Sequence, residues 1–495
     1  IPKNCYAVIT VDFKSLSKKI NFEKVKSMNW FKKLQQGYDN ELTFITKNIA
    51  ANGESSGINF LSNPYIGFFT KDTIEQKTNI VCSFKLSNRE DFEKFIKTIY
   101  PKIIIEMKNG IWMATLQYGG TYLAYNDKYA TIVVRNGNDA LDFITKLYNQ
   151  TEDESIANQT GFDEFRSANK DFGVFANYRE IQSLSSLIRP QLSVLSKTSP
   201  DINFSCVLNF VKDKIELKMK TYYKDEAVKK KYMEVYRSGC SAEHLQAVTT
   251  KNVIAFISLA FNSDKTIALL SETPEVKKVF TEAQKQLGIT EKEFADILGG
   301  DLTFCLNDFK TQTVYKDVFK YETMSIEKDT VTETLPIFTI ALSTKNKAVI
   351  EKIIKKYQIP QAGNSLWKIQ LPMFTEWFAL TDKEMLLVND SSTAATFISN
   401  KKLGEMPLQV KTLALENTAS MYINLDLKQL PESYRNSWKS MTGSAYPKVE
   451  NTFSNFKDIT VSAKADEGLV EINMTNSSFE NSLMRILDIS EQNSK

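Results

Sequence analysis

The side chains of this chain that could carry chemistry are few, and each has an ordinary structural explanation. Residues 53–57 read Gly-Glu-Ser-Ser-Gly, which matches the G-x-S-x-G pattern of serine hydrolases. In those enzymes a strained turn from a strand to a helix presents the serine hydroxyl to a histidine. Here the pattern precedes residues 63–64, Asn-Pro, and a strand, which is the wrong context. We therefore interpret residues 53–57 as a surface loop.

His244 is the only histidine, so any mechanism that needs an imidazole depends on it. Cys240 lies four residues earlier, and on a helix the two side chains would share a face and form half of a metal site or a thiolate pair. The segment around them, 238–247, falls at an inferred domain boundary. We interpret His244 as a surface or helix-capping residue.

Acidic residues offer a second kind of chemistry. The run Glu-Asp-Glu at 152–154 and the turn aspartates Asp127 and Asp382 could bind a cation or act as acid and base. Turn chemistry and solvation explain them without a function. The sequence has no P-loop, no dinucleotide-binding motif, no HExxH and no EF-hand loop. We therefore predict no catalytic residue, no metal site and no cofactor.

Aromatic residues gather in strand-like segments of both halves. The clusters comprise Tyr65, Phe68, Phe69, Tyr118, Tyr122, Tyr125 and Tyr129 in the first half and Phe374, Trp377 and Phe378 in the second. Aromatic grooves stack sugars, peptides or lipids, although aromatic residues in strands more often pack in the core. Gly119 and Gly120 mark a bend where such a surface would open. The candidate binding residues are therefore Tyr118, Tyr122, Phe374 and Trp377.

The elements that must position these residues occur twice. Gly-Ile-Trp at 110–112 corresponds to Ser-Leu-Trp at 365–367, and the turn at 126–128 corresponds to that at 381–383, both 255 positions later. Glu216 and Glu471 have the same spacing. Near the start, residues 3–11 match 251–259 at a spacing of 248. This collinear order predicts two homologous tandem domains, 1–240 and 251–495, with a boundary at about 239–250.

Each predicted domain contains short apolar strands joined by tight turns, with helices interspersed. This pattern is typical of an α+β fold with largely antiparallel sheets. Thr290 followed by Glu293 predicts a capping box at the start of a helix. Two such domains are expected to form a groove at their junction, where ligands often bind.

Composition narrows the possible partners. The 62 basic and 59 acidic residues give a net charge of +3, and basic runs such as 229–231 lie next to acidic residues. Specific nucleic-acid binding is therefore not expected. The five cysteines form no CxxC pair and leave the redox compartment open. No apolar run approaches the length that spans a bilayer, so we expect a soluble chain. Because it begins at Ile1, we expect that an upstream segment was removed.

The opening sequence Ile-Pro-Lys-Asn-Cys-Tyr-Ala-Val-Ile-Thr-Val-Asp-Phe-Lys-Ser-Leu, residues 1–16, resembles the start of a family of Bacteroidetes envelope proteins, domain of unknown function 4836. The lysine- and asparagine-rich composition, the length and the duplicated layout are similar too. Members are typically predicted lipoproteins. The resemblance implies an exported protein of the periplasm or outer membrane, tethered through an upstream lipidated cysteine that this chain lacks. Cys5 is not that cysteine, because no apolar signal region precedes it. The resemblance implies no catalytic residues.

Our hypothesis from the sequence is a non-enzymatic, exported binding protein with a groove between two duplicated domains. Its partner is an unidentified protein, glycan or lipid. A rival hypothesis is a hydrolase of an envelope polymer that uses carboxylates and needs no histidine. A third is a structural spacer without a ligand. The sequence leaves the ligand and the oligomeric state open.

Overall fold

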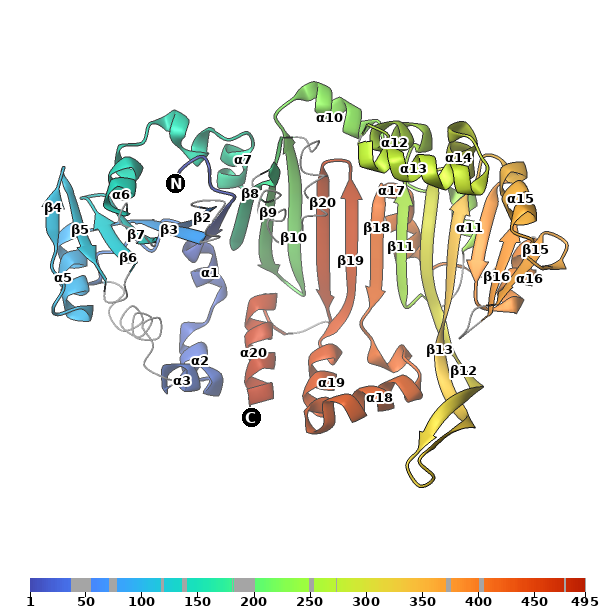
Figure 1. Ribbon diagram of the computed structural model, residues 1–495. Helices are drawn as coiled ribbons and strands as arrows, with labels where there is room; N and C mark the ends of the chain where they lie inside the picture. Colours follow the sequence, from blue (N-terminus) through green and yellow to red (C-terminus); the bar gives the residue numbers. More distant parts are fainter. Residues whose placement is uncertain are drawn as a thin grey trace. The chain divides into compact units, whose positions relative to one another are not determined.

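A computed structural model (Figure 1) describes residues 1–36, 55–70, 78–116, 120–135, 140–179, 181, 201–248, 253–272, 274–370, 375–399, 405–475 and 478–494. The chain divides into two compact units. Unit 1 comprises Ile1–Val228 together with Asn476–Lys495, and unit 2 comprises Lys229–Thr475. No helix in these described ranges is both long and apolar enough to cross a bilayer.

Unit 1 is built on an antiparallel sheet whose described strands run in the order β4-β5-β6-β7-β3-β2-β1-β8-β9-β10. The strands are β1 (Ala7–Val11), β2 (Tyr65–Thr70), β3 (Thr78–Lys85), β4 (Glu106–Lys108), β5 (Ile111–Thr115), β6 (Thr121–Tyr125), β7 (Tyr129–Val134), β8 (Phe172–Asn177), β9 (Ile202–Val211) and β10 (Lys214–Tyr223).

Three helices of unit 1, α1, α2 and α5, start after residues whose side chains cap them. Asn88, for example, accepts a hydrogen bond from the backbone N–H of Asp91. The helices are α1 (Phe13–Lys19), α2 (Phe22–Ser27), α3 (Asn29–Gln36), α5 (Arg89–Ile99), α6 (Ala140–Asn149), α7 (Phe162–Ser167) and α20 (Ser482–Ser494), with 3-10 turns at Glu152–Glu154 and Ile156–Asn158. Helix α10 (Glu226–Met233) spans the division between the units.

Unit 2 has a sheet of the same order, β14-β15-β16-β17-β13-β12-β11-β18-β19-β20. Its strands are β11 (Ala255–Ala260), β12 (Asp301–Lys320), β13 (Ser325–Ser343), β14 (Gln361–Gly363), β15 (Leu366–Gln370), β16 (Thr375–Leu380), β17 (Glu384–Val388), β18 (Ala419–Asn424), β19 (Phe456–Lys464) and β20 (Glu467–Met474). The prediction of an α+β fold with antiparallel sheets is confirmed.

The helices of unit 2 lie between these strands in the chain. They are α11 (Ala242–Ala247), α12 (Ser263–Leu270), α13 (Pro274–Leu287), α14 (Glu291–Ile297), α15 (Lys347–Lys356), α16 (Ser391–Ile398), α17 (Leu408–Glu416), α18 (Glu432–Thr442) and α19 (Tyr446–Ser454), with 3-10 turns at Leu427–Gln429 and Gly443–Ala445. The predicted capping box of Thr290 and Glu293 starts α14, which confirms it.

The two units also share details of local structure. Asn346 caps α15 as Asn88 caps α5. In unit 1 the first residue of α5, Arg89, forms an ion pair with the turn aspartate Asp127 at 3.1 Å. In unit 2 the first residue of α15, Lys347, pairs in the same way with Asp382 at 3.4 Å. The turn aspartates therefore fasten a hairpin to a helix.

Two of the sequence correspondences fail in the strand register. Trp112 lies opposite Tyr125, which corresponds to Leu380 at the spacing of 255. Trp367, however, lies opposite Phe378, two residues before Leu380. Glu216 is the third residue after its hairpin turn and pairs with Asn209, whereas Glu471 is the fifth residue after its turn and pairs with Thr460. A constant spacing in sequence misses these shifts because the hairpins differ in length.

The division between the units does not follow the predicted boundary at 239–250. Residues after Val228 already pack in unit 2, where Tyr236 bridges to Phe261 and the N–H of Cys240 donates to the carbonyl of Ala414 at 2.9 Å. At the other end of the chain, α20 returns to unit 1. There Met484 packs with Val25 and Met28, and these contacts keep residues 476–495 out of unit 2.

Each sheet is packed against helices on one face. In unit 1 the cluster under α6 and α7 includes Val8, Phe175 and Val207, and in unit 2 the cluster under α11, α16 and α17 includes Phe256 and Leu386. On the other face, α5 and α15 pack near the β5–β7 and β15–β17 ends of the sheets.

Candidate functional site

The four candidate binding residues separate into two groups. Tyr118 and Phe374 lie outside the described residues. Tyr122 in β6 and Trp377 in β16 occupy matching positions, opposite Val133 and Val388 respectively. Both are half-buried and pack against the clusters under the helices. They therefore serve packing within their units, and the groove that the sequence predicts stays a prediction.

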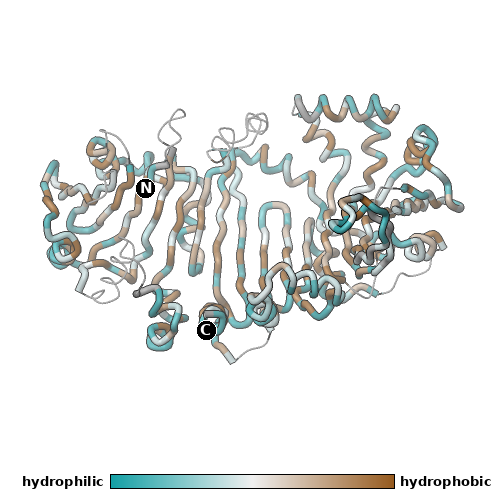
Figure 2. Tube along the Cα trace, turned by 60° about the horizontal axis from the view of Figure 1, so that its bottom comes forward, coloured by the Kyte–Doolittle hydropathy of each residue, from teal (hydrophilic) through white to brown (hydrophobic). Residues whose placement is uncertain are grey.

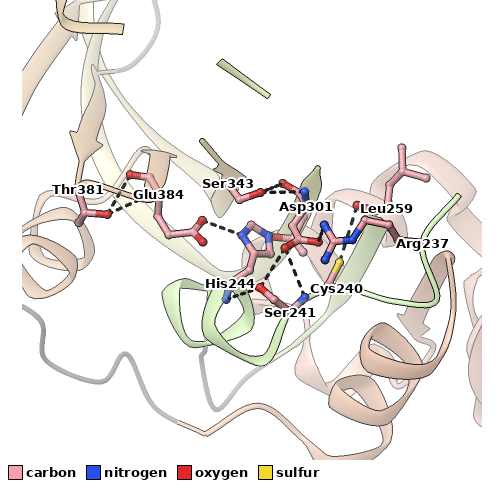
Figure 3. A network of polar contacts seen from close by, with 10 residues as sticks. Arg237, Cys240, Ser241, His244, Leu259, Asp301, Ser343, Thr381 and Glu384 are labelled. Carbon is pink, nitrogen blue, oxygen red and sulfur yellow. Dashed lines mark hydrogen bonds and ion pairs between the residues drawn. The ribbon is translucent and has the colours of Figure 1, made fainter. Parts of the chain in front are cut away.

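His244 is not the surface residue that the sequence predicts. Its side chain is fully buried, and its Nδ1 lies 2.7 Å from a carboxylate oxygen of Glu384 (Figure 3). Its Nε2 lies 3.1 Å from the hydroxyl of Thr303. This burial could not be predicted from the sequence, because Thr303 and Glu384 lie far from His244 in the chain.

A second set of polar contacts adjoins this histidine. Ser241 caps α11 by accepting from the N–H of His244, and its hydroxyl donates to Asp301 at 3.0 Å. Arg237 forms an ion pair with the other carboxylate oxygen of Asp301 at 2.9 Å. Figure 3 shows these side chains converging from α11, its preceding loop and the first residues of β12 and β17. The network fixes α11 on the sheet.

Cys240 takes no part in a thiolate pair with His244. Its sulfur donates to the carbonyl of Leu259 at 3.8 Å, and burial raises the pKa of this thiol to about 12. The group is therefore a protonated thiol at neutral pH. Among the described residues, no group of three histidine, cysteine or carboxylate side chains is placed to hold a metal ion.

The order Glu384, His244, Thr303 is that of an acid–base triad, yet the arrangement lacks access. Thr303 and His244 are fully buried and Glu384 is 8% exposed. A nucleophile must meet its substrate, and a hydroxyl in the middle of a covered sheet face does not. We interpret the network as a satisfied polar core that orients α11.

The uncovered part of the unit 1 sheet has an inverted pattern of burial. On the face packed against helices, polar residues such as Asn203 and Ser205 are buried. On the other face of β2, β1, β8, β9 and β10, paired residues form rows that are almost entirely apolar. One row is Ile66, Ile9, Val174, Cys206 and Met219, and the next is Val11, Phe172, Leu208 and Leu217. All of these side chains are half-buried or exposed.

Unit 2 repeats this pattern on β12, β11, β18, β19 and β20. Three rows follow from the strand register: Leu306, Ala255, Ile423, Ile459 and Ile472; Phe304, Ile257, Met421, Val461 and Val470; and Leu302, Leu259, Ala419, Ala463 and Gly468. None of the fifteen is charged or polar, and none is buried. Ser258 and Ser420, by contrast, are buried on the opposite face and share a hydrogen bond of 2.6 Å.

We call these surfaces the open faces of units 1 and 2. Exposure is greatest at Phe172 and Met219 in unit 1, each 38%, and at Ile257 in unit 2, 47%. Figure 2 shows the brown, hydrophobic residues along the strands of both units. An antiparallel sheet usually turns a polar face to water, so an apolar open face indicates a surface meant to be covered.

A second exposed apolar surface lies at the end of the β12–β13 ribbon, which extends beyond the rest of the unit 2 sheet (Figure 1). Phe319 lies opposite Ile326, and its ring contacts that of Tyr321 with centroids 5.1 Å apart. Tyr321 and Met324 are the first and last residues of the turn. Their side chains are 44%, 69%, 81% and 73% exposed, respectively. We call these four residues the ribbon tip.

A family model described as Domain of unknown function (DUF4836) matches residues 1–483. The chain belongs to this family. The resemblance seen in the opening residues is thereby confirmed over nearly the whole chain. Membership in the DUF4836 family assigns no activity.

Other comparisons add little to the family assignment. No curated protein matches the chain. Crystal forms III, IV and I of TP0453 resemble it with TM-scores of 0.26, 0.25 and 0.27 and sequence identities of 9%, 9% and 8%. These matches cover 45%, 44% and 46% of this chain and 79%, 80% and 80% of TP0453. The function of this DUF4836 chain must therefore be argued from its own surfaces.

Proposed function

We propose that this chain is a non-enzymatic, exported cell-envelope protein that binds lipid acyl chains on the open faces of its two units. The main observation behind this proposal is the pair of open faces, on which apolar side chains point to solvent while polar side chains are buried on the opposite face of each sheet. Covering such a surface releases about 25 cal/mol per Å² of apolar area, which is enough to drive binding.

The chemistry of the open faces favours acyl chains over a protein partner. The backbone N–H and C=O groups of these strands are paired with neighbouring strands. The rows of the unit 2 face contain no charged or polar side chain, so they offer a ligand no directional contact. Protein interfaces normally carry about one hydrogen bond per 100–200 Å². An acyl chain needs none.

Three further observations support the proposal. The ribbon tip presents a tyrosine beside three apolar residues, a combination suited to the boundary between headgroups and acyl chains. The family resemblance implies a tethered lipoprotein, which would hold the chain beside a bilayer. The matching strand orders and helix caps support an origin of the two units by duplication, which would explain why both carry an open face.

The experiment is co-sedimentation with phosphatidylcholine vesicles. One variant carries Ile257→Gln and Leu302→Gln on the open face of unit 2, and another carries Phe172→Gln and Met219→Gln on that of unit 1. Each should weaken vesicle binding about fivefold or more, because amide groups do not bury in hydrocarbon.

The control variants replace residues away from the open faces whose side chains are comparably exposed or more exposed. Tyr129→Gln changes a residue of β7 on the side of the sheet away from the open face of unit 1, and its side chain is 42% exposed. Met441→Gln changes a residue of α18 whose side chain is 84% exposed. Both should bind vesicles like the unmodified protein. Failure of the unmodified protein to bind vesicles, or an equal loss in the controls, would refute the proposal and leave a protein partner or a spacer role.

A further inference from the structure

The strand β12 contains a bulge whose extra residue carries a buried polar atom without a hydrogen-bond partner. Its pairing with β13 shifts between Leu306 and Asp308, so Asn307 is an extra residue. The Asn307 side chain is 8% exposed, and its Nδ2 donates to the hydroxyl of Thr339 at 2.9 Å. Its Oδ1 has no hydrogen-bond donor. A buried acceptor without a donor is costly and calls for an explanation such as a ligand.

Asn307 lines a cavity of about 420 Å³ in unit 2. This volume falls within the range of small-molecule sites, about 300–1,000 Å³. The cavity is lined by Val253, Ile254, Asn307, Asp308, Pro407, Tyr422, Asn424 and Gln429. Five of the eight carry polar side chains, and none of the eight is cationic. A phosphate or another anion would therefore find a carboxylate and no countercharge.

The polar groups supply both donors and acceptors. Asn424 accepts from the N–H of Asp426 through its Oδ1, at 2.9 Å, which assigns its Nδ2 as a donor. Burial and the nearby Asp458 raise the pKa of Tyr422, so its phenol keeps a proton to donate at neutral pH. Asn307 and Asp308 contribute acceptors. Hydroxyl groups, which donate and accept at once, match this set best.

Unit 1 lacks this arrangement. Tyr422 lies opposite Phe256, and the matching residue opposite Val8 in unit 1 is Phe175. Phe175 is 1% exposed and packs edge-on against Phe162. The pairing of β2 with β3 proceeds without an extra residue from Tyr65 to Thr70. Polar groups at this site are therefore a property of unit 2, beyond what the shared fold requires.

We propose that this cavity binds a neutral, hydroxyl-rich ligand, a saccharide unit, with Asn307 Oδ1 accepting from a ligand hydroxyl. The site is separate from the open faces and does not depend on lipid binding. A free sugar and the terminal unit of a glycan chain share this chemistry, and the probes below distinguish them.

The test is titration of the full chain with glucose, N-acetylglucosamine, cellobiose and N,N′-diacetylchitobiose, followed by calorimetry and ligand-observed NMR. At least one probe should bind. Binding by the monosaccharides alone indicates a free sugar, and tighter binding by the disaccharides indicates a chain end. Absence of binding by all four, or tighter binding of inorganic phosphate, would overturn the proposal.

Variants connect binding with the cavity. Tyr422→Phe installs the residue type that unit 1 uses, and Gln429→Ala changes an exposed side chain, so both should fold. Each variant should lower the affinity for the sugar about fivefold, because one hydrogen bond to the ligand is lost. The control Gln286→Ala removes an exposed glutamine on α13 and should bind normally. Unchanged affinity in both cavity variants would place the sugar elsewhere and overturn the proposal.

Discussion

At the scale of single residues, His244 joins α11 to two strands of the unit 2 sheet. We expect His244→Ala to lower the free energy of unfolding by about 3 kcal/mol, because it leaves the Glu384 carboxylate and the Thr303 hydroxyl without a partner and opens a cavity. Chemical denaturation measures this loss. Glu243→Ala, an exposed change on the same helix whose ion pair with Lys383 lies at the surface, should cost less than about 0.5 kcal/mol. Equal losses would show that His244 has no special role.

The buried side chain of Lys170 should make the stability of unit 1 depend on pH. Its side chain is 1% exposed, and Nζ donates to the carbonyls of Arg166 and Ala168, each at 3.1 Å, and to that of Phe165. Burial lowers the pKa of Lys170 to about 8, from 10.5. The folded state therefore binds fewer protons than the unfolded state between these values, and stability gains from this lysine as pH rises through that window.

We expect this gain to be about 1–2 kcal/mol, less than the full shift implies, because the accepting carbonyls favour the charged amine. The measurement is the free energy of unfolding at several pH values, for the unmodified protein and for Lys170→Met. Subtracting the free energy of unfolding of the variant from that of the unmodified protein cancels the contribution of the other groups that titrate in this pH range. A difference between the two that stays flat from about pH 8 to pH 10.5 would contradict the assignment.

At the scale of elements, the β12–β13 ribbon is a separable addition to the unit 2 sheet. Near its base, Phe309 packs on Tyr434 with ring centroids 4.6 Å apart, and β13 pairs with β17 only from Thr339 onward. We expect replacement of residues 313–332 by an Asn-Gly turn between Gln312 and Glu333 to leave the melting temperature nearly unchanged, since these two residues already pair.

The same deletion tests the role of the ribbon tip. Vesicle binding should fall, because Phe319, Tyr321, Met324 and Ile326 are removed together, while circular dichroism should report an intact fold. A shortened protein that binds vesicles as well as the original would remove the ribbon tip from the proposed lipid surface. A large drop in melting temperature would instead show that the ribbon supports the core.

At the scale of the whole molecule, charge should contribute little to membrane binding. The net charge is +3, with acidic and basic residues interspersed, and the open faces hold apolar side chains. We expect vesicle binding to change less than about twofold between about 0.05 and 0.5 M salt. Over this range the Debye screening length shortens severalfold, so binding driven by charge would fall steeply. Vesicle binding should also be similar with and without anionic lipid. A steep loss with salt would indicate that lysines, and not the open faces, carry the binding.

Much of the local structure of this protein was predictable from the amino-acid sequence alone. Short apolar segments bounded by turn residues predicted the strands, Thr290 with Glu293 predicted the start of α14, and the opening residues indicated the family. These features depend on neighbours in the chain. The same holds for Asp127 and Asp382, whose place in turns was readable, although their ion pairs with the first residues of α5 and α15 were not.

Which face of each sheet is covered depends on packing between elements that are distant in the chain. Alternation along β11 predicts that Phe256 and Ser258 share one side and that Ile257 lies on the other, but it does not say which side receives the helices. The helices cover the side with Ser258, so Ile257 is left open. The burial of His244 and the bulge at Asn307 likewise depend on partners distant in sequence. Both features are set by long-range packing, which cannot be read from the local sequence pattern.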